Sequence, residues 1–230
     1  MIDFTFFLEI IPVLLAGLPL TLQLTAASMG IGFLLALLLA LAQQGNRRIV
    51  VWPIRTFVAV FRGTPLLVQI FLIYYGLGQF RPWLQLIGAW PLFREPYWCA
   101  IIALSLNEAA YGSEILRGAI KAVPRGLVEA ATASGMSKLL TLRLIVLPLA
   151  LRQAIPNYSN EIILMVKGTS LASIITLMEV TGIAQDLISQ TYRAVEVFVA
   201  AGAIYLTLNF AIISALNALE AWLTPYRARA

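Results

Sequence analysis

Charged side chains interrupt two stretches of this chain that are otherwise apolar. Glu108 and Glu114 fall within one stretch, and Glu161 and Lys167 fall within the next. A charge at membrane depth is costly, so such residues usually face a cavity or a charged partner. A lysine pairs with a carboxylate and a glutamate accepts from an ammonium group. These residue types therefore predict a binding path for a small zwitterion.

The polar residues around these charges follow a helical spacing. Asn107 and Glu114 are seven residues apart, as are Asn160 and Lys167, which places each pair on one helix face. If the two helices run in opposite directions, both faces lie at similar depth and line one shared cavity. The predicted substrate path comprises Asn107, Glu108, Glu114, Asn160, Glu161, Lys167, Thr169 and Ser170.

The same charges also fit a purely structural role. Glu161 and Lys167 would then form a salt bridge that holds the bundle together, and Glu108 and Glu114 would pair with other helices. In the functional alternative, Lys167 binds a carboxylate and Glu161 an ammonium group. The spare carboxylate of Glu108 or Glu114 would then suit a guanidinium or another cationic side chain.

The composition identifies an integral membrane protein. Hydrophobic residues make up 60% of the chain, charged residues 12%, and the mean hydropathy is +0.87. With no histidine and one cysteine, histidine metal sites, Ser-His-Asp triads and disulfide frameworks are excluded. The chain also lacks a P-loop, so we expect no cofactor, no metal and no ATP site of its own. The basic residues do not gather on one soluble face, which argues against nucleic acid as a partner.

The apolar segments predict an all-α, single-domain protein over residues 1–230 with five membrane spans, since a span needs about 20 apolar residues. Residues 1–15 are predicted to form an amphipathic segment at the membrane interface. The predicted spans cover about 17–43, 53–79, 97–120, 154–178 and 196–222, and a polar loop covers about 121–153.

Basic residues set the predicted orientation. Four arginines lie between the first two spans, six basic residues between the third and fourth, and two at the end of the chain. The opposite side has only Arg81, Arg94 and Arg193. The positive-inside rule then places the N-terminus outside, and the 121–153 loop and the C-terminus in the cytoplasm.

The polar loop contains a spaced motif. Glu129, Ala130 and Ala131 are followed by Gly135, and after nine more residues by Ile145, Leu147 and Pro148. Small and apolar positions recur at helical spacing before Gly135, which predicts a short helix with a glycine stop. We expect Glu129 near the helix start, where it favours the helix dipole, and Pro148 at the end of the next segment.

This motif resembles the cytoplasmic "EAA" loop of bacterial ATP-binding-cassette (ABC) importer permeases. The alternative is a chance alanine-rich loop, but the full spacing and the position between two spans both favour the resemblance. It implies a type I importer permease fold with a coupling helix that docks on a separate ATPase. The residues assigned to coupling are Glu129, Ala130, Ala131, Gly135, Leu147 and Pro148.

Three further stretches, at 62–69, 103–118 and 158–170, resemble the polar amino acid permeases of the histidine/glutamine branch. The runs at 66–76 and 176–180 are most similar to arginine-system permeases. The resemblance implies two ABC ATPase subunits that bind the ATP, a second permease (a copy or a paralogue) and an extracytoplasmic substrate-binding protein.

We therefore expect a multi-pass permease of the bacterial inner membrane, in contact with membrane lipid, that transports a basic amino acid. Arginine is favoured, with histidine, lysine and glutamine as alternatives. A stand-alone proton-coupled transporter with Glu108, Glu114 and Glu161 as a relay is the rival from another class, and a small channel is a third. Secondary transporters usually carry internal repeats, and none is visible here.

Overall fold

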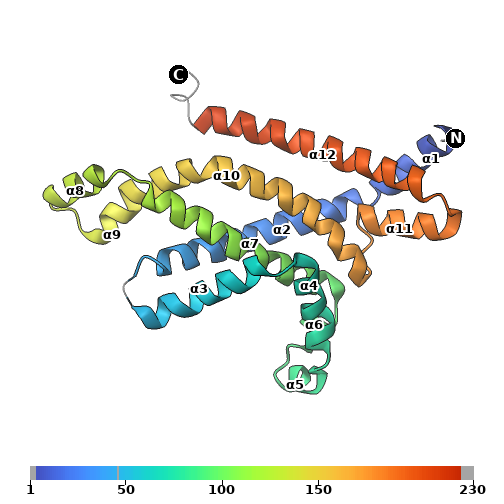
Figure 1. Ribbon diagram of the computed structural model, residues 1–230, viewed down its shortest axis with the longest axis horizontal. Coiled ribbons are helices and arrows are strands. Elements are labelled where there is room, and N and C mark those ends of the chain that lie inside the picture. The colour runs from blue at the N-terminus through green and yellow to red at the C-terminus, as the bar shows by residue number, and fades with distance from the viewer. Residues whose placement is uncertain (1–3, 46, 224–230) are drawn as a thin grey trace.

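The computed structural model describes residues 4–45 and 47–223, and helices are the only regular elements in these ranges. They form an elongated bundle (Figure 1). Helix α1 (Phe4–Leu15) and helix α11 (Val180–Thr191) lie at one end, and helices α8 (Arg125–Ala133) and α9 (Lys138–Thr141) at the other. Helix α12 (Ala194–Leu223) runs along one side.

The centre of the bundle is the parallel pair α2 (Leu18–Ala42) and α7 (Pro96–Lys121), which make the most extensive contact between any two elements. Small residues permit this approach. A Cβ atom added to Gly32 of α2 would overlap the Glu108 side chain of α7 and lie 3.1 Å from the Ser105 carbonyl. Gly17, just before α2, approaches the backbone of Glu179 equally closely.

The predicted second span is broken in the middle. Helix α3 (Arg48–Gly63) is followed by α4 (Leu66–Phe71) and a π-helical turn, η1 (Leu72–Gly76), at an angle of 110°. Pro65 disfavours a helical conformation in the residue before it, and Thr64 is extended, with φ −117° and ψ 144°. The chain then passes through two short helices, α5 (Arg81–Leu86) and α6 (Trp90–Phe93), which lie below the bundle in Figure 1.

The predicted fourth span is longer than expected. Helix α9, a π-helical turn η2 (Leu142–Val146), α10 (Leu147–Gly168) and the 3₁₀ segment η3 (Thr169–Ile175) form one helical run of 38 residues. Pro148 does not end a segment, so that prediction was wrong. It occupies the first turn of α10, where a missing backbone N–H is tolerated, and the π-turn before it absorbs the register change.

Within the described residues, three helical runs are long and apolar enough to cross a membrane, and a fourth qualifies if the broken pair α3–α4 counts as one span. They match the predicted first, second, fourth and fifth spans. Helix α7 is long enough, at 26 residues, but its polar side chains lower its hydropathy. Those side chains face neighbouring helices, since α2, α3 and α10 cover α7. The predicted third span, at about 97–120, thus stays a prediction.

Candidate functional site

The predicted coupling helix is present as α8 and ends as the sequence indicated. Gly135 has a left-handed backbone, with φ +78°. The Gly135 N–H donates to the Thr132 carbonyl at 3.0 Å, and the Met136 N–H donates to the Ala131 carbonyl at 3.1 Å. This pair of bonds is a Schellman motif, which satisfies carbonyls at a helix end and favours glycine. The prediction that Gly135 stops the helix is confirmed.

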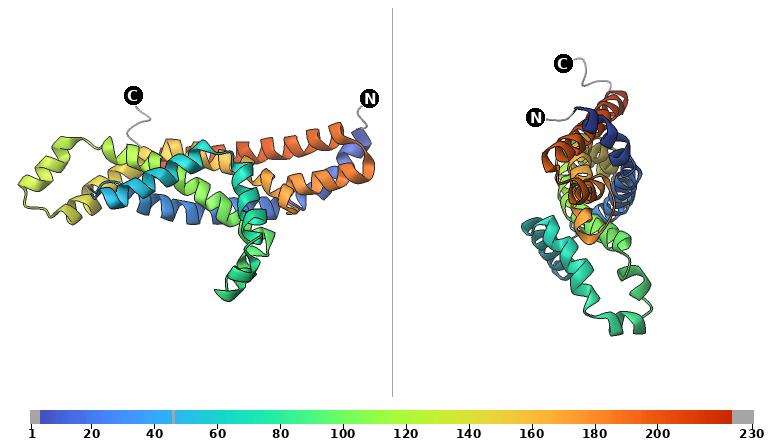
Figure 2. Two further views of the ribbon diagram at one scale, coloured as in Figure 1. Left: turned by 60° about the horizontal axis from the view of Figure 1, so that its bottom comes forward. Right: turned by 90° about the vertical axis from the view of Figure 1, so that its right-hand side faces the viewer.

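Helix α8 projects from the bundle, beyond the ends of α2, α3 and α7 (Figure 1; Figure 2, left). Glu129 and Ala130 are exposed, whereas Ala131 packs inward and is 4% exposed. Glu129 lies four residues after the helix start, so the expected role at the helix dipole is not supported. Leu147 is half-buried and Pro148 is exposed at the start of α10.

Apolar side chains are also exposed around α8. Leu127, Leu139 and Leu144 are 45%, 75% and 58% exposed, and Leu140 is 44% exposed. Contiguous exposed apolar surface usually marks an interaction site. These leucines differ from the apolar surface of the membrane spans in two ways. They lie among charged residues in the sequence, and they lie on or beside a helix that points away from the bundle.

Two predicted path residues share a cavity at the break between α3 and α4. Asn107 of α7 and Glu161 of α10 both line a space of about 270 Å³. Its wall also includes Thr64 and Pro65, which lie at the break, and Tyr111, which lies one turn after Asn107. Glu161 is 9% exposed and forms no ion pair in the described part of the chain. Its carboxylate is therefore available to a cationic ligand.

Gln69 organises this cavity and was missed by the sequence reasoning. Its Nε2 donates to the carbonyls of Phe61 at 2.7 Å and Thr64 at 3.1 Å, and to the Thr64 hydroxyl at 3.0 Å. Its Oε1 accepts from Asn107 Nδ2 at 2.9 Å. Gln69 thus caps the end of α3 and orients Asn107. The sequence feature that could have indicated this role is a glutamine within an apolar run that follows a Thr-Pro pair.

Lys167 and Ser170 line a different cavity, of about 470 Å³, next to α12. Tyr205 and Asn209 of α12 also line it. Lys167 is exposed and forms no ion pair in the described part of the chain, so the predicted Glu161–Lys167 salt bridge is absent from this structure.

The other polar residues of this region are bonded within their own helix or exposed. Thr169 donates to the Val166 carbonyl at 2.7 Å, and Ser170 donates to the Lys167 carbonyl at 2.6 Å. Asn160 is exposed. Neither hydroxyl is oriented toward Glu161 by a hydrogen bond.

Glu108 lies in none of these cavities. It is fully buried in α7, against Gly32 of α2, and neither carboxylate oxygen has a hydrogen-bond partner. The Tyr158 hydroxyl of α10 is near Glu108. A Cβ atom added to Gly112 would overlap both that hydroxyl and the Glu108 Oε1 atom. Glu108 therefore meets α2 and α10 in the interior of the bundle.

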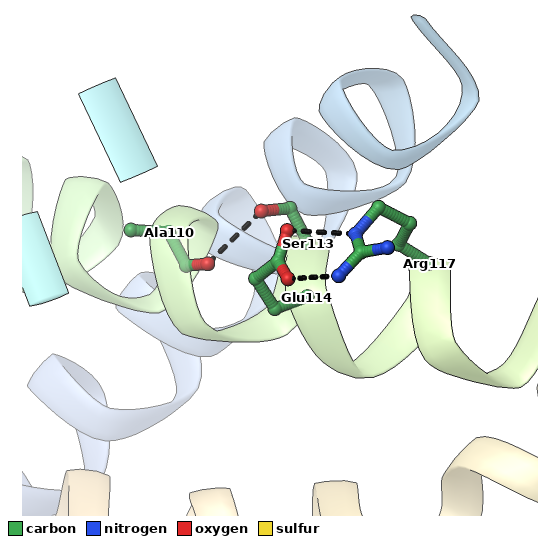
Figure 3. A network of polar contacts seen from close by, with 4 residues as sticks. All are labelled: Ala110, Ser113, Glu114 and Arg117. Atoms are coloured by element: carbon green, nitrogen blue, oxygen red, sulfur yellow. Dashed lines mark hydrogen bonds and ion pairs between the residues drawn. The ribbon is translucent and has the colours of Figure 1, made fainter. Parts of the chain in front are cut away.

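Glu114 is paired within its own helix. Arg117 Nε donates to Glu114 Oε1 at 2.9 Å, and Arg117 Nη2 contacts Glu114 Oε2 (Figure 3). This pair lines a third cavity, between α2, α3 and α7. The expected single path is therefore divided over three cavities: one is lined by Asn107 and Glu161, one by Lys167 and Ser170, and one by Glu114.

Comparison with known proteins decides the family. The model of the family described as "Binding-protein-dependent transport system inner membrane component" matches residues 28–225. The chain belongs to this family of inner membrane permeases. The permease is 56% identical over 220 residues to the octopine transport system permease protein OccM of Rhizobium meliloti, covering 96% of this chain and 89% of the relative. It is 47% identical over 201 residues to the arginine ABC transporter permease protein ArtM of Escherichia coli strain K12, covering 87% and 90%.

Solved structures confirm the permease fold. A crystal structure of an amino acid ABC transporter with histidines matches with a TM-score of 0.85 and 32% identity, covering 96% of this chain and 98% of that one. An inward-facing structure of the MetNI methionine ABC transporter matches with a TM-score of 0.75 at 20% identity, covering 94% and 98%, which supports the fold alone. The chain is therefore a permease subunit of an amino acid ABC importer and not itself an enzyme.

Proposed function

We propose that this permease forms half of the translocation path of an ATP-driven importer for a basic amino acid, with arginine as the favoured substrate. The observation that carries the proposal is the projecting helix α8, with its Schellman stop at Gly135 and its exposed leucines. An isolated projecting helix with apolar surface gains stability only by docking. The docking partner in this proposal is one of two ABC ATPase subunits, which bind and hydrolyse the ATP.

The remaining partners follow from the same assignment. A second permease, either a copy or a paralogue, completes the path, and an extracytoplasmic binding protein delivers the substrate. The N-terminus lies outside and the C-terminus in the cytoplasm, on the side of α8. This orientation puts the coupling helix where ATP is present, and it is supported by the clustering of basic residues.

Two features support a basic substrate. Glu161, beside Asn107, offers an unpaired carboxylate to a guanidinium or ammonium group. Relatives of this permease are named for arginine, octopine and nopaline transport. Lys167 and Ser170, with Asn160 and Thr169 on the same helical run, form a second part of the path that receives the substrate carboxylate.

Coupling then follows from rigid-body motion. When ATP draws the two ATPases together, each pulls on the α8 docked in it. Helix α8 and the start of α10 move together, because the turn at Gly135 and the helical run from Lys138 connect them. The resulting rotation of α10 against α7 changes which end of the Asn107–Glu161 cavity is open, in the manner of hinge and rocking motions.

The test is reconstitution with the candidate ATPase and binding protein, followed by uptake of labelled arginine and measurement of ATP hydrolysis. We expect binding protein loaded with arginine to stimulate ATPase activity and ATP-dependent uptake. Gly135 supplies the matched variants. Asparagine tolerates the left-handed region, whereas valine does not.

A Cβ atom at Gly135 meets no atom within 4 Å, so the effect of valine is on the backbone and not on packing. Its cost is about 1–2 kcal/mol, which corresponds to a 5- to 30-fold lower population of the correctly formed turn between α8 and α9. We expect Gly135→Val to weaken ATPase binding by about this factor and Gly135→Asn to bind nearly as the parent does. Gly126→Ala, in open space on the same helix, is the control. Parental uptake and ATPase binding in Gly135→Val would contradict the proposal.

A further inference from the structure

A cavity of about 310 Å³ lies between α3, α7 and the residue after α2, at the end of the bundle that carries α8. Its polar walls are Gln43 after α2, Arg55 and Arg62 of α3, and the pair Glu114–Arg117 of α7. Three guanidinium groups therefore face one carboxylate. The cavity shares no lining residue with the neighbouring Asn107–Glu161 cavity, and the proposed function assigns it no ligand.

The single carboxylate of this cavity is already neutralised. Arg117 holds Glu114 through two contacts on the same helix (Figure 3). Arg55 and Arg62 have no carboxylate partner in the described part of the chain. The Arg62 guanidinium lies over the Tyr111 ring, 5.3 Å from its centroid, which fixes its position. Neither arginine thus has a carboxylate within ion-pair distance among the described residues, although Arg62 lies near enough to Glu114 and Glu161 for an electrostatic attraction.

Gln43 provides an independent observation that points to a ligand. Its side chain is 92% buried, and its amide Nε2 has no acceptor. A buried donor without an acceptor is unfavourable, so such groups usually have a partner when the site is occupied. Every unsatisfied group in the cavity is a hydrogen-bond donor. The missing partner is therefore an oxyanion.

The surroundings favour a phosphate group from a membrane lipid. Helix α3 carries Arg48, Ile49 and Trp52 in its first turns, and Ile49 and Trp52 are 83% and 72% exposed. Exposed tryptophan beside arginine is typical of the membrane–water interface. Guanidinium groups bind phosphate oxygens through paired hydrogen bonds. A headgroup phosphate at this depth lies within reach of Arg55 while its acyl chains remain beside α3.

We propose that this cavity binds the phosphate group of an anionic lipid of the α8-side leaflet. The bound phosphate joins Gln43, Arg55 and Arg62, and so ties α3 to the end of α2. Helix α3 otherwise contacts α2 only sparsely. The inference uses the proposed function only for the side of the membrane, because the cavity and its charges are properties of the permease alone.

The test measures lipid retention by the purified full-length chain, using native mass spectrometry after extraction in detergent. Phosphatidylglycerol, phosphatidylcholine and inorganic phosphate are the three probes. We expect phosphatidylglycerol to bind, and Arg55→Gln and Gln43→Met each to reduce that binding by about tenfold, the effect of a charge-assisted hydrogen bond. Arg48→Gln removes the same charge from the same helix outside the cavity and should leave the binding within about twofold of the parent.

Each other outcome overturns the proposal. An equal loss in Arg48→Gln and Arg55→Gln would show general attraction to the basic surface. Equal binding of phosphatidylcholine would remove the role of headgroup charge. Binding of inorganic phosphate alone, still dependent on Arg55, would assign the cavity to a soluble anion.

The buried thiol of Cys99 reports folding in every variant, since it stays unreactive in the native state. If Arg55→Gln does not fold, Arg55→Lys replaces it. That variant keeps the charge, loses the paired geometry, and should bind less phosphatidylglycerol than the parent.

Discussion

Replacing Gln69 by methionine removes four hydrogen bonds at the break between α3 and α4 while nearly conserving side-chain volume. Gln69 is 6% exposed and bonds to Phe61, Thr64 and Asn107. The variant leaves the Phe61 carbonyl and the Asn107 amide without these partners. At roughly 1–2 kcal/mol for each stranded group, we expect a destabilisation of about 2–4 kcal/mol. Thr64 is exposed and its hydroxyl keeps its bond to the Val60 carbonyl at 2.8 Å, so it adds little.

A thermal unfolding assay with a thiol-reactive dye measures this effect. The only cysteine, Cys99, is fully buried, so the dye reacts when the bundle opens. For a chain of this length, 1 kcal/mol shifts the melting temperature by about 2–4 °C. Gln69→Met should therefore melt about 4–16 °C below the parent. Gln85→Met, at an exposed position of α5, is the matched control and should melt within about 2 °C of the parent.

A double-mutant cycle separates the role of Gln69 as a positioning residue from a general loss of stability. Asn107→Leu alone strands the Gln69 oxygen, so the combined variant should cost less than the sum of the two, by about 0.5–3 kcal/mol. Additive effects would refute the reasoning that Gln69 acts through Asn107. So would a melting temperature of Gln69→Met that matches the Gln85→Met control.

Three further predictions concern the path, the α11–α12 contact and the topology. Glu161→Ala and Lys167→Ala should each keep basal ATPase activity and lose arginine uptake. Because the two residues are not paired, the double variant should show no recovery of stability, and recovery would restore the salt-bridge alternative. The Tyr205 hydroxyl donates to the buried Glu179 carboxylate at 2.6 Å. Tyr205→Phe should thus lower thermal stability by roughly 1–3 kcal/mol, whereas Tyr192→Phe, at a side chain that is 90% exposed, should not. A reporter active only in the cytoplasm should work when inserted within 124–140 and fail within 82–95, and activity at the second site would contradict the orientation.

The class of protein, and helix α8 with its glycine stop, could be predicted from the sequence, because both depend on local order along the chain. Membrane spans are recognised from continuous apolar length, since each backbone group in a bilayer must be satisfied within its own helix. The motif from Glu129 to Pro148 depends on spacing within one loop. The stop at Gly135 follows from the backbone freedom of glycine, and its φ of +78° confirms that inference.

Only the tertiary structure decided how the polar side chains are grouped. Periodicity indicated that Asn107 and Glu114 share a face, but the neighbours of that face differ along its length. Asn107 meets Gln69 and Glu161 at the 110° break, while Glu114 meets Arg117 beside α3. The angle of that break, and thus the position of α3, depends on contacts between residues far apart in sequence. The spacing of residues within one helix sets which side chains share a face, but the packing of the other helices determines what that face contacts.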